Sequence, residues 1–164
     1  MTTRRRLIFS GTREPLSEQD RATLLALVQA WAGQADEIGV GDCPTGVDSQ
    51  IREWLPEARV FVADWKKHGN AAGPMRNDMV IWASKADTSL LIAMPQPERS
   101  KSRGTWNCVD SAVHNWVPVL IAAIGCGPSV AVETAKAQAA EIERLRELAQ
   151  ASISAAQRYA MERT

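Results

Sequence analysis

Five short apolar runs, separated by stretches with helical spacing, constrain the fold of this chain more than any other feature. They occupy residues 7–9, 37–40, 60–63, 89–94 and 117–124. The fourth run is apolar on both faces, which is typical of a central strand in a parallel sheet covered on both sides. Between the runs, apolar residues recur at helical intervals, as at Leu24, Val28 and Trp31. This alternation predicts an α/β, three-layer fold with a mostly parallel sheet.

The 164 residues suffice for one ordinary domain. We assign this domain to residues 1–127 and a C-terminal helical extension to residues 128–164, as one long helix or two shorter ones. The extension carries a stripe at 3–4 spacing, half of it small residues: Ile142, Leu145, Ala149, Ser152, Ala156 and Tyr159. Two interpretations stay open, because such a stripe suits packing on the chain's own domain or contact with another copy. We expect a homo-oligomer.

Composition and charge exclude several classes of protein. The formal net charge is zero, which makes nucleic acid an unlikely partner. Cys43, Cys108 and Cys126 form no CxxC or Cys/His pattern, so neither a disulfide framework nor a zinc site is expected. No apolar run approaches the roughly 20 residues that span a bilayer, and no secretory signal is recognisable. We therefore predict a cytoplasmic protein without a membrane partner, a metal or a bound cofactor.

The loops after the first two predicted strands carry groups suited to an anionic ligand. Gly11, Thr12 and Arg13 follow the first strand and offer close backbone approach, a hydroxyl and a fixed cation. Gly46 follows the second strand at the start of a predicted helix, where backbone N–H groups favour anions. Asp48 suits either a helix cap or a contact to a ribose or base. No Lys-Ser/Thr pair follows Gly46, so this is not a Walker A loop.

The loop after the third strand is the richest in polar groups. We predict an irregular loop over residues 64–73, with Asp64, Trp65 and His68 as candidate ligand contacts. Trp65 can stack on a base or line the core, and His68 can bind or be a solvated loop residue. Arg76 and Asn77 lie in the first turn of the next helix, where a cation is unfavourable unless it faces an anion.

The loop after the fourth strand supplies the last candidates. Its residues 95–104 are polar and basic, and Gly104 and Thr105 open the following helix. Thr105 suits either an anion site or a plain N-cap. Each loop is a modest signal alone. Their common position at the carboxyl ends of successive strands, where parallel sheets bind ligands, predicts one site for a small molecule.

Four stretches of this chain together resemble the YspA-like (YAcAr) branch of the SLOG superfamily. They are 11–13, 41–48, 63–69 and 73–77, and the Asp-Trp, His-Gly and Gly-Pro-Met-Arg-Asn elements are the most specific. The superfamily also includes the LOG-type, lysine decarboxylase-like nucleotide hydrolases and the DNA-processing protein DprA. The resemblance covers about residues 5–123. It implies a Rossmann-like fold that binds a nucleotide or a nucleotide-derived signalling ligand of the NAD, ADP-ribose or cyclic nucleotide type.

The second half of the chain departs from the LOG-type pattern. In those enzymes an Arg near a helix start and a Glu just after a Gly-Gly-x-Gly-Thr motif cleave an N-glycosidic bond. Arg76 is similar to that Arg, but Asn107 and Cys108 stand where the acid is expected. Such cleavage needs a carboxylate. Four candidates remain unranked by sequence, namely Asp42, Asp48, Asp64 and Asp110.

We therefore predict ligand binding, by sensing or sequestration, in preference to catalysis. A LOG-type hydrolase of nucleoside monophosphates or NAD derivatives is the first alternative. A DprA-type module for single-stranded DNA is the second, and it depends on the basic loop that contains Arg99, Lys101 and Arg103.

Overall fold

The computed structural model describes residues 4–83 and 88–161, and gives the backbone but not the side chains of residues 155, 156 and 158–160. The strands are β1 Arg5–Gly11, β2 Glu37–Gly41, β3 Arg59–Phe61, β4 Thr88–Met94 and β5 Val119–Ile121. The α-helices are α1 Glu18–Trp31, α2 Gly46–Trp54, α3 Trp65–His68, α4 Ala72–Ala83, α5 Arg103–His114 and α6 Pro128–Met161. Single 3-10 turns lie at Ala32–Gln34, Gly69–Ala71 and Arg99–Lys101.

The five strands form one all-parallel sheet in the order β3-β2-β1-β4-β5. The register of the two central strands pairs Leu7 with Leu90 and Phe9 with Ile92. The chain moves outward from β1 to β3, then returns to the other side of β1 for β4 and β5. The strand order therefore reverses between β1 and β4, and open α/β sheets bind ligands at the carboxyl side of such a switch point.

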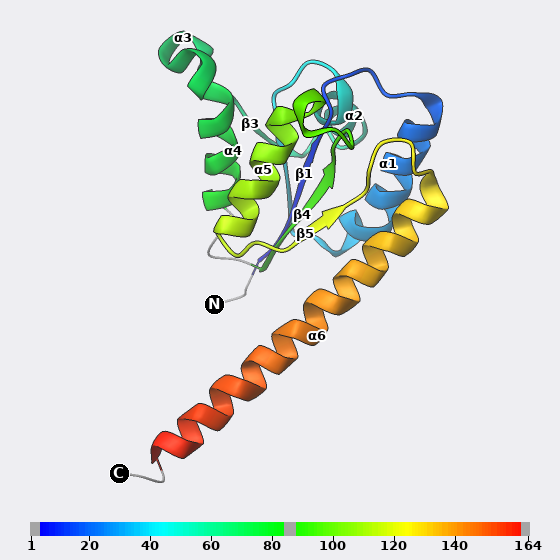
Figure 1. Ribbon diagram of the computed structural model, residues 1–164. Helices are drawn as coiled ribbons and strands as arrows, with labels where there is room; N and C mark the ends of the chain where they lie inside the picture. Colours follow the sequence, from blue (N-terminus) through cyan, green and yellow to red (C-terminus); the bar gives the residue numbers. More distant parts are fainter. Residues whose placement is uncertain (1–3, 84–87, 162–164) are drawn as a thin grey trace.

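Helices cover both faces of the sheet, which confirms the predicted three-layer α/β fold (Figure 1). One core layer packs α1, α2 and the start of α6 on the sheet and includes Phe9, Leu24 and Ile51. The other packs α4 and α5 and includes Ile8 and Ile81. Each such side chain stabilises the fold by about 1.5–3 kcal/mol when fully buried.

A short polar network holds the start of α1 in place. Ser17 is the N-cap residue, and its hydroxyl accepts a hydrogen bond from the Asp20 backbone N–H at 3.1 Å. The buried Asp20 carboxylate also accepts from the backbone N–H of Gly125 at 2.8 Å. These contacts cap α1 at its start and tie it to the turn before α6.

Helix α4 buries a different face from the one that its apolar residues indicate. Met75, Met79 and Trp82 share one side of the helix at helical spacing, yet all three are exposed. The buried side instead carries Arg76 and Asn77 together with Val80, Ile81, Ala72 and Gly73. Two polar residues can be buried here because both find hydrogen-bonding partners.

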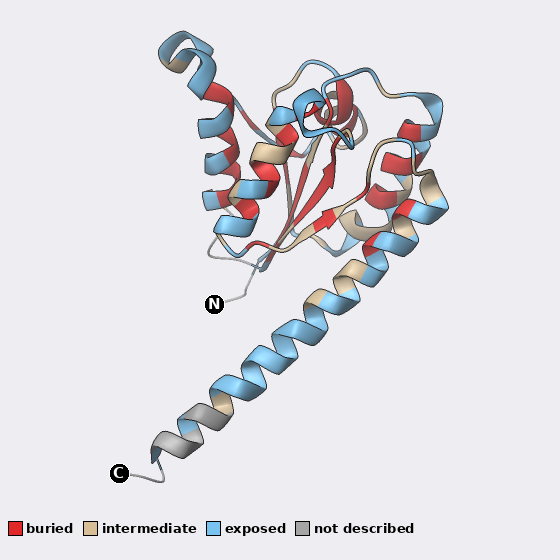
Figure 2. Ribbon diagram, viewed as in Figure 1, coloured by how far each residue is buried: buried red, intermediate tan, exposed pale blue. Residues whose placement is uncertain are grey.

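Helix α6 is one continuous helix of 34 residues. Ala131 and Ala135 are buried against α1, and Ala139 and Ile142 are partly buried. Beyond Ile142 the helix runs away from the sheet, and its described side chains there are almost all exposed (Figure 2). Within residues 4–83 and 88–161, none of the helices is apolar over enough of its length to span a membrane.

Candidate functional site

The loops after β1 and β2 are joined by direct contacts. Gly46 adopts a φ of +69°, and a side chain there would overlap the carbonyl of Thr12. The Val47 backbone N–H donates to that carbonyl at 3.1 Å. The Thr45 hydroxyl donates to the carbonyl of Arg13 at 2.6 Å. Glycine at position 46 therefore lets α2 start directly against the end of β1.

A buried charge cluster lies beneath these loops. The Arg76 guanidinium of α4 donates from Nη1 to Asp42 Oδ1 at 2.9 Å, and the same nitrogen lies 3.7 Å from Asp48 Oδ2. The second oxygen of Asp42 accepts from the backbone N–H of Ala63 at 2.9 Å. Gly41 makes the arrangement possible, because a Cβ there would overlap both Arg76 and Asp48.

The two carboxylates in the cluster have different environments. Both Asp42 oxygens are engaged by the protein, whereas Asp48 receives one long hydrogen bond, from the Cys43 backbone N–H at 3.4 Å. Asp48 is also buried. Burial raises its pKa, against the opposing effect of Arg76. Asp48 is therefore the group in the cluster most able to hold or exchange a proton.

Asn77 connects α4 to α5. Its side-chain amide donates to the carbonyl of Gly104 at 2.9 Å and to Asn107 Oδ1 at 3.0 Å. Its own Oδ1 accepts from Arg76 Nε at 3.0 Å. The sequence places Asn77 beside Arg76 at the start of this helix, where it is a candidate ligand contact. In the structure its amide is committed to protein partners, so it positions Arg76 and the start of α5.

A cleft of about 650 Å³ opens at the carboxyl end of the sheet, above β1 and beside the starts of α2, α4 and α5. A volume of this size is typical of small-molecule sites. Four basic and two acidic side chains line the cleft, namely Arg13, Arg76, Lys101, Arg103, Glu14 and Asp48. Two of these cations are paired within the protein, Arg76 with Asp42 and Asp48 and Lys101 with Glu98, so Arg13 and Arg103 are the side chains of the lining best placed to attract an anionic ligand.

An aromatic ring and a guanidinium lie together at this cleft. The Arg13 guanidinium carbon lies 5.9 Å from the centre of the Trp65 ring, and 47% of Trp65 is exposed. A Cβ added at Gly73 would contact both side chains, so glycine leaves room for them at the start of α4. Of the two interpretations of Trp65, the structure excludes the core. The ring lines the cleft and is about half exposed.

Most of the predicted site residues line this one cleft. They are Gly11, Arg13, Asp48, Trp65, Arg76, Asn77, Gly104 and Thr105. Two of the capping alternatives do not hold, because Thr45 is the N-cap residue of α2 and Ser102 that of α5. The Thr105 hydroxyl instead accepts from Ser102 at 3.0 Å.

Four predicted residues lie outside the lining. Thr12 is buried, and Gly46 packs on its carbonyl. Asp64 caps a short helix, where it accepts from the Lys67 backbone N–H at 3.0 Å. His68 lies at the end of that helix. The prediction of an irregular loop over residues 64–73 is wrong. One helical turn, a 3-10 turn and the start of α4 occupy this segment.

The structure also adds residues that the sequence did not single out. Ser10, Cys43, Asn70 and Asn107 line the cleft. Cys43 and Asn70 lie in loops that we identified, whereas Ser10 lies at the end of β1 and Asn107 in the first turns of α5. Proximity to the carboxyl end of a strand was therefore the available signal. Cys108 lies beneath the site, and burial raises the pKa of its thiol to about 12, which leaves it neutral and unreactive.

The four carboxylates that could serve in N-glycosidic cleavage have different positions in the structure. Asp110 pairs with Arg99 at 3.0 Å on the surface, Asp64 caps α3, and Asp42 is held by Arg76 and Ala63. Asp48 is the one of the four that lines the cleft. Among the described residues, no group of three or more His, Cys, Asp or Glu side chains could hold a metal ion.

Comparisons with protein-family models, with curated proteins and with solved structures gave no match to this chain.

Proposed function

We propose that this chain binds a nucleotide or a nucleotide-derived ligand, such as one of the NAD, ADP-ribose or cyclic nucleotide type, in the cleft at the carboxyl end of the sheet. The observation that carries the proposal is the pairing of Arg13 with the half-exposed ring of Trp65, in the cleft that the Arg76–Asp48 pair also lines. An aromatic face suits a base, and fixed guanidinium groups suit a phosphate.

The arrangement gives each group a role. Trp65 stacks on the base, and Arg13 contacts a phosphate from the cleft mouth. Gly104 lets the ligand approach the backbone at the start of α5. Gly11 also lines the cleft, but its missing side chain makes room for Val47 of α2. Arg76 holds the Asp48 side of the cleft in place from below, and Asp48 faces a ribose hydroxyl or a base nitrogen. Binding without turnover is consistent with the sequence after Gly104 and Thr105, where no acid follows directly.

Thermal shift against AMP, 3′,5′-cyclic AMP, NAD and ADP-ribose tests the proposal. A ligand at about 100 times its Kd adds roughly 2.7 kcal/mol to stability. We expect at least one member of the panel to raise the Tm of the wild type. The same ligand should give a smaller shift for Trp65→Ala. No shift with any member at millimolar concentration would contradict the proposal.

Hydrolysis of an N-glycosidic bond is a second candidate, and Asp48 is the observation that favours it. A buried carboxyl with a raised pKa, beside an arginine and on the wall of the cleft, suits a general acid or base. Chromatography of AMP and NAD after incubation with the protein distinguishes the two. Turnover that is lost in Asp48→Ala and in Arg76→Ala would replace binding by catalysis.

Single-stranded DNA is less well supported. The basic loop that kept this alternative open has much of its charge paired, since Arg99 contacts Asp110 at 3.0 Å and Lys101 contacts Glu98 at 3.0 Å. Arg99 also lies over the Trp106 ring, at 4.6 Å from its centre. These contacts reduce the positive charge that a nucleic-acid backbone would meet.

A further inference from the structure

The outer half of α6, residues 143–161, extends from the domain without a supporting element. Its described side chains from Glu143 to Ile153 are all exposed, and no strand or other helix accompanies it in Figure 1. In proteins, most helical stability comes from packing an apolar face on a neighbouring element rather than from intrinsic helix propensity. The outer half of α6 therefore calls for a packing partner.

The face that such a partner would cover is defined by the residues themselves. Leu145, Leu148 and Ile153 are each about half exposed, at 51%, 52% and 51%. With Ala149 and Ser152 they lie on one side of the helix, continuing the side that Ala131, Ala135 and Ile142 present to the domain. Charges are absent from residues 148–157, although this stretch extends into solvent. Charged groups are depleted at the centres of protein interfaces in the same way.

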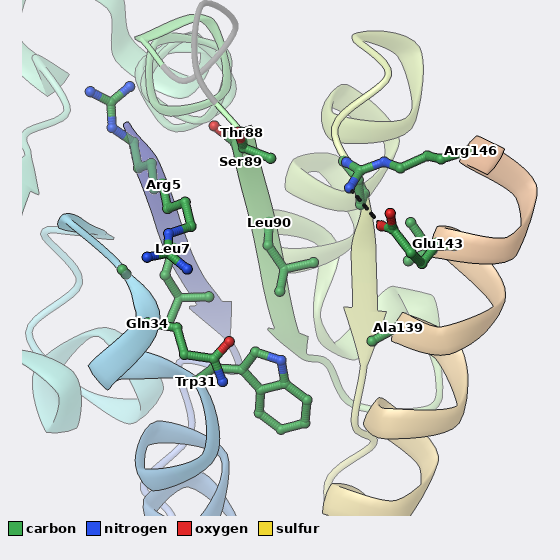
Figure 3. Close-up of a pocket in the computed structure, with 14 residues that line it drawn as sticks. Arg5, Leu7, Trp31, Gln34, Thr88, Ser89, Leu90, Ala139, Glu143 and Arg146 are labelled. Atoms are coloured by element: carbon green, nitrogen blue, oxygen red, sulfur yellow. Dashed lines mark ion pairs between the residues drawn. The ribbon is translucent and has the colours of Figure 1, made fainter. Parts of the chain in front are cut away.

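A groove lies where the outer half of α6 leaves the domain. Figure 3 shows Trp31, Leu7 and Leu90 on one side and Ala139 of α6 on the other, around a cavity of about 340 Å³. An ion pair between Arg146 and Glu143, with N and O atoms 3.5 Å apart, borders it. The groove is at the amino end of the sheet, opposite the ligand cleft. Its lining also includes Ile142, which directly precedes the exposed part of α6.

We propose that these surfaces bind a second copy of this chain, with the two α6 helices antiparallel. The order of residue sizes along the face argues for this direction. When the two-fold axis lies between residues 150 and 151, Leu148 is level with Ile153 of the second copy, and Ala149 is level with its Ser152. The small pair at the centre allows close approach of the helices, and the large pair closes the contact on each side.

The length of α6 supports the same register. With this axis, Met161 of one copy is level with residue 140 of the other, beside the groove lined by Ala139 and Ile142. Met161 is 69% exposed in the single chain. The last turn of each helix thus reaches the apolar groove of its partner. A parallel pair would place both domains at the same end and would leave both grooves without a helix end.

Sedimentation equilibrium tests whether the pair forms. We expect the wild type to be a dimer and both Leu148→Arg and Ile153→Arg to be monomers with unchanged helical circular dichroism. These side chains are exposed in the single chain, so the substitutions spare its fold. Val113→Arg is the matched control, because Val113 is 63% exposed on α5, on the other face of the sheet. It should remain dimeric. A monomeric wild type, or dimeric arginine variants of α6, would overturn the proposal.

Spin labels distinguish the direction of the helices. Ala137 and Gln150 are both exposed on α6, and each can be replaced by a labelled cysteine in a Cys43→Ser, Cys126→Ser background. With a rise of about 1.5 Å per residue, the antiparallel pair separates the two Ala137→Cys labels by roughly 40 Å along the axis. The two Gln150→Cys labels lie side by side. Equally short distances at both positions would show a parallel pair and refute this geometry.

Discussion

At the scale of single residues, the candidate site depends on glycines that allow charged side chains to approach the backbone. Gly41 is the clearest case, because the Arg76 guanidinium and the Asp48 carboxylate occupy the space that a Cβ would need. Arg76 cannot move away freely, since Asp42 and Asn77 hold it by hydrogen bonds of 2.9 and 3.0 Å. The sequence feature that matters here is thus the absence of a side chain.

Gly41→Ala should lower the free energy of unfolding by about 1–3 kcal/mol, because the new methyl group displaces a buried ion pair. Gly33→Ala is the matched control, since a Cβ there meets nothing within 4 Å. Its effect should be at most about 1 kcal/mol. Urea denaturation measures both. Equal effects of the two substitutions would mean that the cluster adjusts without cost.

Asp48 should make stability depend on pH in a defined direction. Because burial raises its pKa in the folded state, the native chain binds this proton more tightly than the unfolded chain. The contribution of Asp48 to stability is therefore greatest below the unfolded pKa, about 4, and declines as pH rises through the folded pKa. Arg76, Arg52, Asp42 and the Cys43 N–H face the carboxyl, and desolvation outweighs their combined effect.

Asp48→Asn removes this titration and gives the test. Urea denaturation of both proteins between pH 4 and pH 8 should show the wild type losing stability relative to the variant as pH increases. The difference should level off above the folded pKa. A wild type that gains stability relative to the variant over the same range would show that pairing with Arg76 outweighs burial.

At the scale of elements, the long helix α6 has two halves with different roles. The inner half is part of the domain, because Ala135 is fully buried against α1 and Ala131 nearly so. Ala135→Glu should therefore lower the free energy of unfolding by about 2–5 kcal/mol, as a charge enters a packed contact. Ala140→Glu, at an exposed position of the same helix, should change it by less than about 0.5 kcal/mol.

A thermal or urea transition for the two variants checks this division. Equal stability of Ala135→Glu and Ala140→Glu would mean that the domain does not need α6, and the predicted boundary at residue 128 would then separate two independent parts. The two interpretations of the C-terminal extension, packing on its own domain and contact with another copy, therefore apply to different halves of α6. Its inner half packs on its own domain, and we propose that its outer half contacts another copy.

Local patterns predicted all five strands and the parallel sheet, because buried strands need continuous apolar runs. Most of the site residues that they predicted line the cleft, because the loops that follow parallel strands lie at one edge of the sheet. Local patterns could not predict that Arg76 and Asn77 are buried. Their burial depends on hydrogen-bonding partners from other segments, Asp42 and Gly104. Met75, Met79 and Trp82 show the same limit, because an apolar pattern does not show which side of a helix meets the sheet.

Gly46 and Thr12 illustrate the limit at the site itself. Their types and spacing suggested contact with a phosphate, but the groups involved bond to each other's loops. A glycine that is required for a positive φ cannot be distinguished, from the sequence alone, from a glycine that makes room for a ligand. Only the three-dimensional arrangement separates the two.

At the scale of the whole molecule, the ligand cleft and the α6 surface lie at opposite ends of the sheet. Their lining residues do not overlap within the described part of the chain. A ligand bound at the cleft thus has no direct contact with the second copy. We expect Leu148→Arg to leave ligand affinity unchanged, which keeps the two proposals independently testable.

The pairing of Trp65 with Arg13 is the centre of the functional account. Isothermal titration with the ligand that gives the largest thermal shift, or with ADP-ribose if the shifts are equal, measures its contribution. Trp65→Ala should weaken binding by about 1–3 kcal/mol, roughly 5- to 150-fold, through the loss of stacking. Trp116→Ala is the control, because Trp116 is 92% exposed and lies between α5 and β5, away from the cleft. Its affinity should equal that of the wild type. Equal affinity of the Trp65→Ala and Trp116→Ala variants would contradict the account.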